Sequence, residues 1–145
     1  MSDLGRELST AVVAFHEAVG ARLGVSAVDQ RALALLGKHG PMPAGELAKR
    51  INLTPGAVTG VVDRLEDAGL ARRDPDPQDR RKVLVRAVDG VFGDVFSELS
   101  AAMAKVTARY TPEEQQVIGD WVVRTIDVLK EQTNKLSAGR RPPRS

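Results

Sequence analysis

The sequence predicts a mainly α-helical protein that carries one small β-ribbon. Apolar residues recur at helical spacing along most of the 145 residues. The period changes only near residues 70–86, where two short β-type runs flank a segment rich in proline and aspartate. Aromatic residues make up 3% of the chain, so the core must consist of Leu, Val, Ile and Ala, which fill the seams between packed helices. A chain of this length fits one domain.

The first two predicted helices span residues 8–23 and 26–38. In the first helix, Val12 and Val19 belong to an apolar series at helical spacing. The second begins at Ser26, a good N-cap, with Asp29 in the first turn, where an acidic side chain favours the helix dipole. Gly40 suits a left-handed C-cap and ends this helix.

The next two helices are separated by a tight connection at residues 52–53, which predicts a helix-turn-helix. The third helix spans residues 44–51. The fourth begins with Thr54 as N-cap and Pro55 in the first helical position, and Gly69 ends it. Its apolar residues follow the i, i+3, i+4, i+7 pattern of a buried helix face: Val58, Val61, Val62 and Leu65.

Two short strands, at residues 70–73 and 82–86, form the predicted ribbon. The loop between them contains two prolines and three aspartates, which is typical of a turn. Residues 72–86 include six basic and three acidic residues. Arginine suits insertion into a minor groove because its guanidinium is planar and always charged. We expect Asp79 to orient Arg81 through a local salt bridge.

Two long helices complete the predicted fold. The first starts after Asp89, its expected cap, and ends near Tyr110. The second starts at Thr111, with Pro112 and the capping-box residue Glu114. Each carries an apolar stripe. The stripe of the first helix consists of Phe92, Val95, Phe96, Leu99, Met103 and Val106, and that of the second, predicted to face inward, consists of Val117, Ile118, Trp121, Val122, Ile126 and Leu129.

These two stripes are longer than one small domain needs. A chain of this size can bury one of them in its own core, and a partner helix from a second copy explains the other. The alternative is a monomeric helical hairpin that caps the domain. We therefore expect a homodimer.

The order of the elements, with a helix-turn-helix followed by a ribbon, defines a winged helix. In this arrangement the second helix of the pair enters the DNA major groove and the ribbon reaches the backbone or the minor groove. The outer face of the fourth helix carries small residues, one hydroxyl and one cation: Gly56, Ala57, Thr59, Gly60 and Arg64. Gly60 costs about 1 kcal/mol of helix stability relative to alanine, which close approach to DNA would justify.

Other interpretations stay open at this point. A winged helix also serves protein contacts as an adaptor, and a charged loop is often only solvated. Arg72 or Arg73 can simply flank the sheet, and Gly60 can relieve packing. A non-specific architectural DNA binder is a third alternative, which the basic residues of the C-terminal tail would fit: Arg140, Arg141 and Arg144.

Several functional classes are disfavoured. The chain has no cysteine, which excludes disulfides, thiolate metal sites and cysteine nucleophiles. We find no Gly-rich phosphate loop after a strand and no nucleophile-elbow motif, so we expect no enzyme. With two histidines we expect no metal and no other cofactor. No signal peptide and no apolar run of about 18 residues is present, so we expect a soluble, cytoplasmic protein without a membrane partner.

The central part of the chain carries four recognisable segments: residues 45–48 (GELA), 53–59 (LTPGAVT), 62–70 (VDRLEDAGL) and 73–75 with 79–85 (RDP and DRRKVLV). Together these segments resemble the MarR family of bacterial and archaeal regulators. The most specific element is the Asp-x-Arg of Asp79 and Arg81. Ala87-Val88 stands where the family often has Leu-Thr, and Pro43 stands where it often has a Ser or Thr cap.

The resemblance implies a ligand-responsive repressor that binds a pseudo-palindromic operator as a homodimer and is released by a small, often aromatic or anionic molecule. Arg81 would enter the minor groove from the tip of the wing. The remaining residues expected to contact double-stranded DNA are Thr54, Gly56, Ala57, Thr59, Gly60, Arg64, Arg73, Asp79, Arg80 and Lys82. Phe15 and His16 are weaker candidates for a ligand site, and a half-buried interface position is the simpler interpretation of His16.

These considerations predict three regions. Residues 25–88 form the winged helix-turn-helix. Residues 1–24 and 89–137 form a helical dimerisation region, and residues 138–145 form a disordered basic tail.

Overall fold

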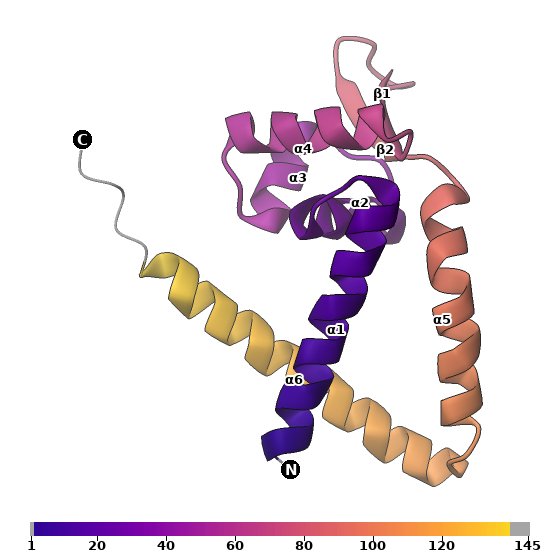
Figure 1. The fold of residues 1–145 in the computed structure, drawn as a ribbon. Coiled ribbons are helices and arrows are strands. Elements are labelled where there is room, and N and C mark those ends of the chain that lie inside the picture. The colour runs from indigo at the N-terminus through magenta and orange to yellow at the C-terminus, as the bar shows by residue number, and fades with distance from the viewer. Residues whose placement is uncertain (1, 140–145) are drawn as a thin grey trace. The chain divides into compact units, whose positions relative to one another are not determined.

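The computed structural model describes residues 2–139, and these form a mainly α-helical fold with one two-stranded antiparallel sheet (Figure 1). Its elements are α1 (Ser2–Leu23), α2 (Ala27–His39), α3 (Ala44–Ile51), α4 (Pro55–Asp67), β1 (Ala71–Pro75), β2 (Val83–Ala87), α5 (Val91–Thr107) and α6 (Pro112–Ala138). The chain divides into two units between Ser97 and Glu98, inside α5. The fold class and the order of elements predicted from the sequence are confirmed.

The helix ends lie where local chemistry places them. Ser26 and Asp29 form a reciprocal capping box at the start of α2, and Thr54 caps α4 by accepting a hydrogen bond from the Ala57 N–H. Thr111 heads a second capping box at α6. Each of these caps depends on residues three positions apart, so the sequence alone predicted all of them.

The turn between α3 and α4 requires an unusual backbone conformation. Asn52 adopts φ 60° and ψ 45°, and it is the one non-glycine residue with positive φ in the described chain. Asparagine tolerates the left-handed region better than most residues. At the end of α2, Gly40 also has positive φ, but its ψ of −175° is extended, so the predicted left-handed helical cap is not formed there.

The β1–β2 ribbon pairs Ala71 with Ala87 and Pro75 with Val83. Both strands lie one or two residues C-terminal of the predicted bounds, because the Leu70 N–H donates to Leu65 O (2.8 Å) and thus still belongs to the end of α4. The sequence did not reveal a third participant: Met42, before α3, exchanges two backbone hydrogen bonds with Val85 at 3.1 and 2.8 Å. This bridge ties the base of the ribbon to the helix-turn-helix.

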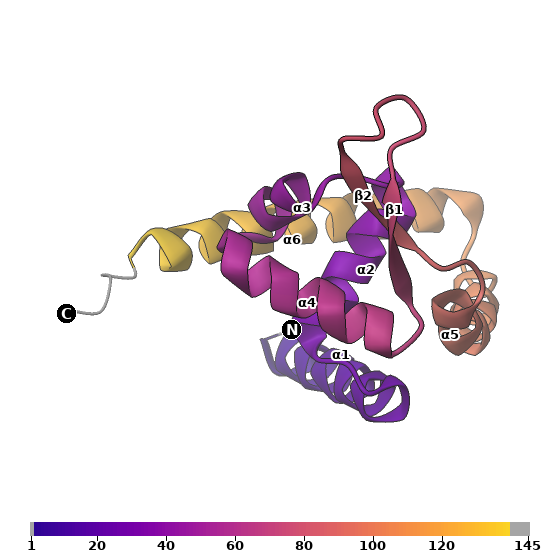
Figure 2. The same cartoon turned by 90° about the horizontal axis from the view of Figure 1, so that it is seen from above.

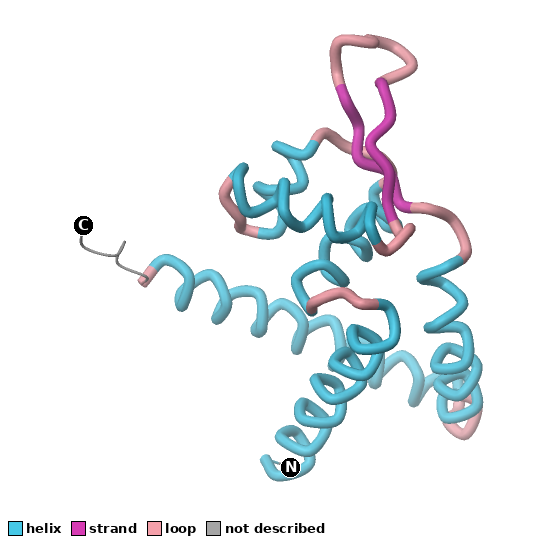
Figure 3. Tube along the Cα trace, turned by 45° about the horizontal axis from the view of Figure 1, so that its top comes forward, coloured by secondary structure: helices cyan, strands magenta, loops and turns pink. Residues whose placement is uncertain are grey.

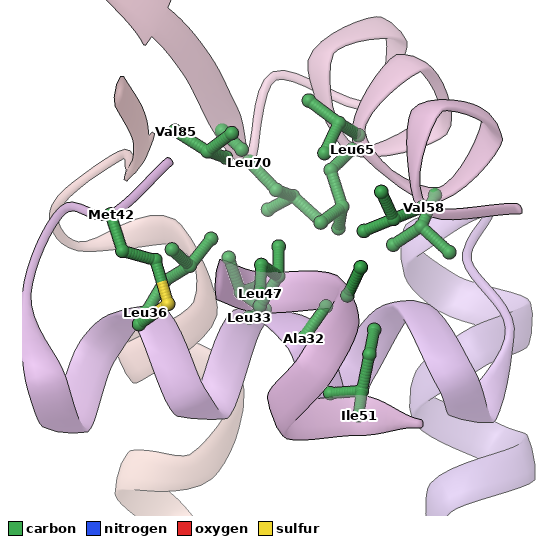
Figure 4. Close-up of a cluster of buried hydrophobic side chains, with 14 of the residues drawn as sticks. Ala32, Leu33, Leu36, Met42, Leu47, Ile51, Val58, Leu65, Leu70 and Val85 are labelled. Carbon is green, nitrogen blue, oxygen red and sulfur yellow. The ribbon is translucent and has the colours of Figure 1, made fainter. Parts of the chain in front are cut away.

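One apolar core holds α2, α3, α4 and the base of the ribbon together (Figure 4). Leu33 of α2, Leu47 of α3 and Leu65 of α4 point toward one another and are each at most 1% exposed. All four predicted apolar residues of α4 are buried, as are the predicted Leu47, Ala48 and Ile51 of α3. The core fixes α4 by one face and leaves its opposite face to solvent, as Figure 2 shows from above.

Gly20 lies where α1 packs closely against the segment that follows it. A Cβ at this position would lie 2.5 Å from the Val25 carbonyl oxygen, which is backbone and cannot move aside cheaply. We expect Gly20→Ala to lower the free energy of unfolding by about 1–3 kcal/mol through overpacking. Gly37→Ala is the matched control, because nothing lies within 4 Å of its Cβ, and it should raise stability by roughly 0.5–1 kcal/mol. Urea unfolding of both variants checks the opposite signs.

The long helices differ from the sequence prediction in three respects. α1 begins at Ser2 rather than residue 8, and it carries Leu4 and Leu8 in continuation of its apolar series. The stripe of α6 does not face inward within the chain: no described residue of α6 is buried, and Trp121 is 52% exposed. Gly90, not Asp89, accepts the first hydrogen bond of α5, from the Asp94 N–H.

Two further predictions concern the chain ends and membranes. α6 continues to Ala138, the first residue of the predicted tail, and residues 140–145 lie outside the described residues. No single described helix is long and apolar enough to cross a membrane. Among the described residues, only α1 and α2 taken together reach the length and composition of a membrane span, and this pair is bent by 88°.

Candidate nucleic-acid interface

The N-terminal half of α4 presents a smooth, exposed surface. Gly56, Ala57 and Thr59 are exposed, and Gly60 is half-buried. A Cβ at Gly56 would meet nothing within 4 Å, and one at Gly60 would meet only the end of the Arg64 side chain, at 3.3 Å. Packing inside the described chain therefore does not demand glycine at position 56, whereas a side chain at position 60 would require the Arg64 guanidinium to shift. The hypothesis that Gly60 allows a close approach to DNA stays a prediction, and the packing alternative stays open beside it.

The polar groups at the start of α4 are partly used within the helix. The Ala57 N–H donates to the Thr54 hydroxyl, and Pro55 has no N–H, so Gly56 supplies the free N–H of this first turn. The Thr59 hydroxyl donates to the Pro55 carbonyl at 3.0 Å. Thr59 thus offers its oxygen lone pairs and its methyl group outward, rather than a donor.

Arg64, predicted to contact DNA, is bound to Asp29 across the domain. Its Nη2 lies 2.9 Å from Asp29 Oδ1 and its Nε lies 3.1 Å from Oδ2, which is a bidentate pair. Asp29 is fully buried, whereas the Arg64 side chain is 52% exposed. Burial raises the pKa of Asp29, but hydrogen bonds from Arg64 and from the Ser26 backbone and hydroxyl outweigh it, so the pKa lies below its ordinary value of 3.8.

The Asp29–Arg64 pair should matter for stability. Arg64→Ala leaves a buried carboxylate with fewer donors and should lower the free energy of unfolding by about 2 kcal/mol.

The contribution of Asp29 to stability should also depend on pH. Because the pKa of Asp29 is lower in the folded state, this contribution is fully present above the ordinary Asp pKa and is lost as pH falls through the lower folded-state pKa. In Asp29→Asn, the free energy of unfolding measured by urea unfolding should therefore fall less steeply at acidic pH than it does in the wild type.

An exposed ion pair provides the control for Arg64→Ala. Arg50 pairs with Glu46 one turn away at 2.9 Å, with side chains 40% and 47% exposed. Surface pairs of this kind contribute roughly 0.3–0.5 kcal/mol. Equal losses of stability in Arg50→Ala and Arg64→Ala would contradict the structural role assigned to the buried pair.

Arg73, also predicted to contact DNA, pairs with two carboxylates of α4. It binds Asp63 at 2.8 Å and also binds Glu66, and its side chain is 31% exposed. Partial burial lowers the pKa of the Arg73 guanidinium, but the two carboxylates outweigh this effect and hold the pKa above its ordinary value. The guanidinium therefore joins the wing to α4.

The outer face of the ribbon carries a second set of paired charges. Arg72 and Arg86 are direct partners across the two strands. Asp74 lies within 3.8 Å of Arg72 and 3.2 Å of Arg86, so one carboxylate serves two guanidinium groups. Like charges opposite each other destabilise a ribbon, and Asp74 offsets this repulsion.

The tip of the wing is different, as its loop extends beyond the two strands (Figure 3). Arg80, Arg81 and Lys82 are exposed, and none has an ion-pair partner among the described residues. The expected Asp79–Arg81 salt bridge is not formed. Instead, Asp79 Oδ1 accepts a hydrogen bond from the Arg81 backbone N–H at 3.1 Å, so the aspartate shapes the loop and leaves the guanidinium unengaged.

The two candidate ligand residues lie on α1. His16 is half-buried; its Nδ1 is 3.0 Å from Gln30 Oε1, and Gln30 Nε2 donates to the His16 carbonyl at 2.8 Å. An apolar groove of about 630 Å³ is lined by His16, Val12, Gln30 and Phe96, among others. Phe15 does not line it but packs edge-on against Phe96, with ring centroids 5.5 Å apart. No group of three potential metal ligands occurs among the described residues.

Comparison with known proteins relates this geometry to one family. Residues 25–83 match the profile of the MarR family. The chain is 38% identical over 136 residues to YcgE of Bacillus subtilis, an uncharacterized HTH-type transcriptional regulator, covering 92% of this chain and 88% of the relative. It is also 38% identical over 88 residues to the repressor MdtR of the same organism, covering 60% and 56%. The crystal structure of a MarR-like regulator from Thermotoga maritima matches with TM-score 0.68 and 25% identity, covering 88% and 95%.

Proposed function

Because this chain belongs to the MarR family of transcriptional regulators, which are not enzymes, we propose that it represses transcription by binding a pseudo-palindromic operator as a homodimer. In this proposal α4 enters the major groove through Thr54, Gly56, Ala57, Thr59 and Gly60. The wing tip reaches the adjacent minor groove through Arg80, Arg81 and Lys82. A small effector releases the protein from DNA.

The observation that carries the DNA-binding proposal is the distribution of paired and unpaired cations. Arg64, Arg73, Arg72 and Arg86 each bind a carboxylate of the same chain. The cations of the tip have no such partner in the described chain, and holding three of them in one loop costs energy through mutual repulsion. A polyanion that supplies phosphates and a negative minor groove would offset this repulsion.

The homodimer is supported by the unburied apolar side chains of α6. Ile118, Val122, Ile126 and Leu129 recur at helical spacing and are between 41% and 61% exposed. An amphipathic helix needs an apolar surface to cover such a stripe, and a two-fold partner supplies an identical one. Two recognition helices related in this way would lie about one DNA turn apart, roughly 34–36 Å.

The effector proposal rests on the groove of α1, α2 and the start of α5. Its lining is mostly apolar, with Phe96 as the aromatic wall and with His16, Glu17, Gln30 and Arg31 as polar residues, among which Arg31 supplies a cation. These features fit a small aromatic acid. Adding a panel of aromatic acids to the operator complex should release the DNA for at least one of them, and a panel without any effect on the DNA complex would count against this chemical class.

In vitro selection tests the proposed function. The purified protein would select duplexes from a random library at physiological salt. We expect an inverted repeat whose half-site centres lie about 10–10.5 bp apart. Retained duplexes without any common motif would indicate an architectural binder, and failure to retain any duplex even at low salt would favour a protein-interaction role.

A further inference from the structure

We propose that Arg73 is a positioning residue that fixes the wing to the recognition helix α4, rather than a residue that contacts DNA. The proposal rests on the proposed DNA-binding function and deepens it, because it assigns the geometry of the interface to one ion-pair cluster. The cluster consists of Arg73 on β1 and of Asp63 and Glu66 on α4.

The alternation of side chains along β1 explains why Arg73 faces α4. Ala71 is buried in the core and Arg72 is exposed, so Ala71 and Arg73 point to the inner face of the ribbon and Arg72 to the outer face. Arg73 is opposite Val85, which is 1% exposed and packs in the core. Arg73 therefore occupies the position where the inner face of the ribbon leaves the apolar core.

Beyond Arg73, the wing has few attachments to the domain. Pro75 is exposed, and the backbone hydrogen bonds of the tip, such as Asp76 N–H to Lys82 O at 2.9 Å, join the loop to itself. No hydrogen bond or ion pair joins residues 74–82 to α4 within the described chain, so the ion pairs of Arg73 are the polar contacts between wing and recognition helix nearest to the tip. The loop beyond the strands projects away from the helices (Figure 1). The direction in which the tip leaves the domain depends on these ion pairs.

The charges of α4 also need this arginine. Asp63 lies one turn beyond Thr59 and its side chain is 57% exposed, on the side of α4 proposed to meet DNA. An unpaired carboxylate there would repel phosphates. Arg73 contacts both Asp63 and Glu66 through Nη1, and its positive charge offsets part of their combined negative charge.

Two variants with opposite charge changes separate positioning from direct contact. Arg73→Gln removes the cation. The double variant Asp63→Asn/Glu66→Gln removes its partners and keeps the cation. If Arg73 contacted DNA, the double variant would free it and would bind operator more tightly. If Arg73 positions the wing, both variants should bind operator about tenfold more weakly, while the double variant does not lose affinity for a shuffled duplex.

Hydrogen exchange of the free protein supplies a readout independent of DNA. The amides of residues 76–82 should exchange at least several-fold faster in both variants than in the wild type, because the polar contacts between wing and recognition helix nearest to the tip are gone. Arg72→Gln is the matched control, because it removes the same charge from the preceding residue of β1, on the outer face, where the side chain is 65% exposed. Wing exchange should not change in this variant.

The outcomes distinguish the two levels of the proposal. A wild-type protein that does not discriminate operator from shuffled duplex would overturn the proposed function, and wing exchange would then decide on the role of Arg73. Normal operator binding by the wild type, together with tighter binding by the double variant or unchanged wing exchange in Arg73→Gln, would overturn the positioning role alone.

Discussion

Replacing Val122 by Glu should convert the protein from a dimer to a monomer and weaken operator binding by about 10²–10⁴-fold. Val122 is flanked by Ile118 and Ile126 one turn away on either side, in the exposed stripe of α6. A carboxylate at the centre of an apolar interface would lose its hydration without gaining a partner. Loss of the dimer also removes the linkage of two half-sites, which contributes affinity of this order.

The control for this variant lies on the same helix. Gln116→Glu introduces the same charge on the side of α6 that carries Asp120 and Arg124, and it should leave both the dimer and operator binding unchanged. Sedimentation equilibrium and fluorescence anisotropy would measure the two properties. A dimeric Val122→Glu protein with wild-type affinity for the operator would show that this stripe is not the dimer interface.

Replacing Arg81 by Ala should weaken operator binding by about 1–3 kcal/mol, which is roughly 5–150-fold, without lowering thermal stability. Arg81 is exposed and has no ion-pair partner among the described residues, so removal of its guanidinium should not change the stability of the folded protein. If the guanidinium enters the minor groove, the loss should be greater for the operator than for a shuffled duplex.

Arg64→Ala provides the contrast to Arg81→Ala. It should lower stability, because Asp29 loses its bidentate partner, and any loss of operator affinity should be restored at lower temperature, where the folded population recovers. Unchanged operator affinity in Arg81→Ala, measured by anisotropy at physiological salt, would refute the assignment of Arg81 to the tip contact.

The sequence predicted those features that depend on neighbouring residues. The caps at Ser26, Thr54 and Thr111 and the buried face of α4 follow from spacings of three or four residues, and the structure confirms them. It could not predict where an arginine side chain goes when several carboxylates compete for it. Asp29 is already explained by its cap, so nothing in the sequence indicated that it also binds Arg64, 35 residues away.

The ribbon also combines features that the sequence predicts with contacts that it does not. Its existence follows from the change of period, but the Met42–Val85 bridge joins residues 43 positions apart and has no local signature. The pairing of Arg73 with α4 could have been inferred from alternation along β1 once its register was known, since Ala71 must face the core. The register depends on tertiary packing around Leu70, which the sequence does not specify.

Fluorescence anisotropy across a salt series tests sequence-specific DNA binding most directly. The wild-type protein would be titrated into the selected operator duplex and into a shuffled duplex of the same composition. We predict a Kd of about 10⁻⁸–10⁻¹¹ M for the operator near physiological salt, and much weaker binding of the shuffled duplex that fades as salt rises. Equal affinity for the two duplexes at every salt concentration would contradict the account of this protein as an operator-binding regulator.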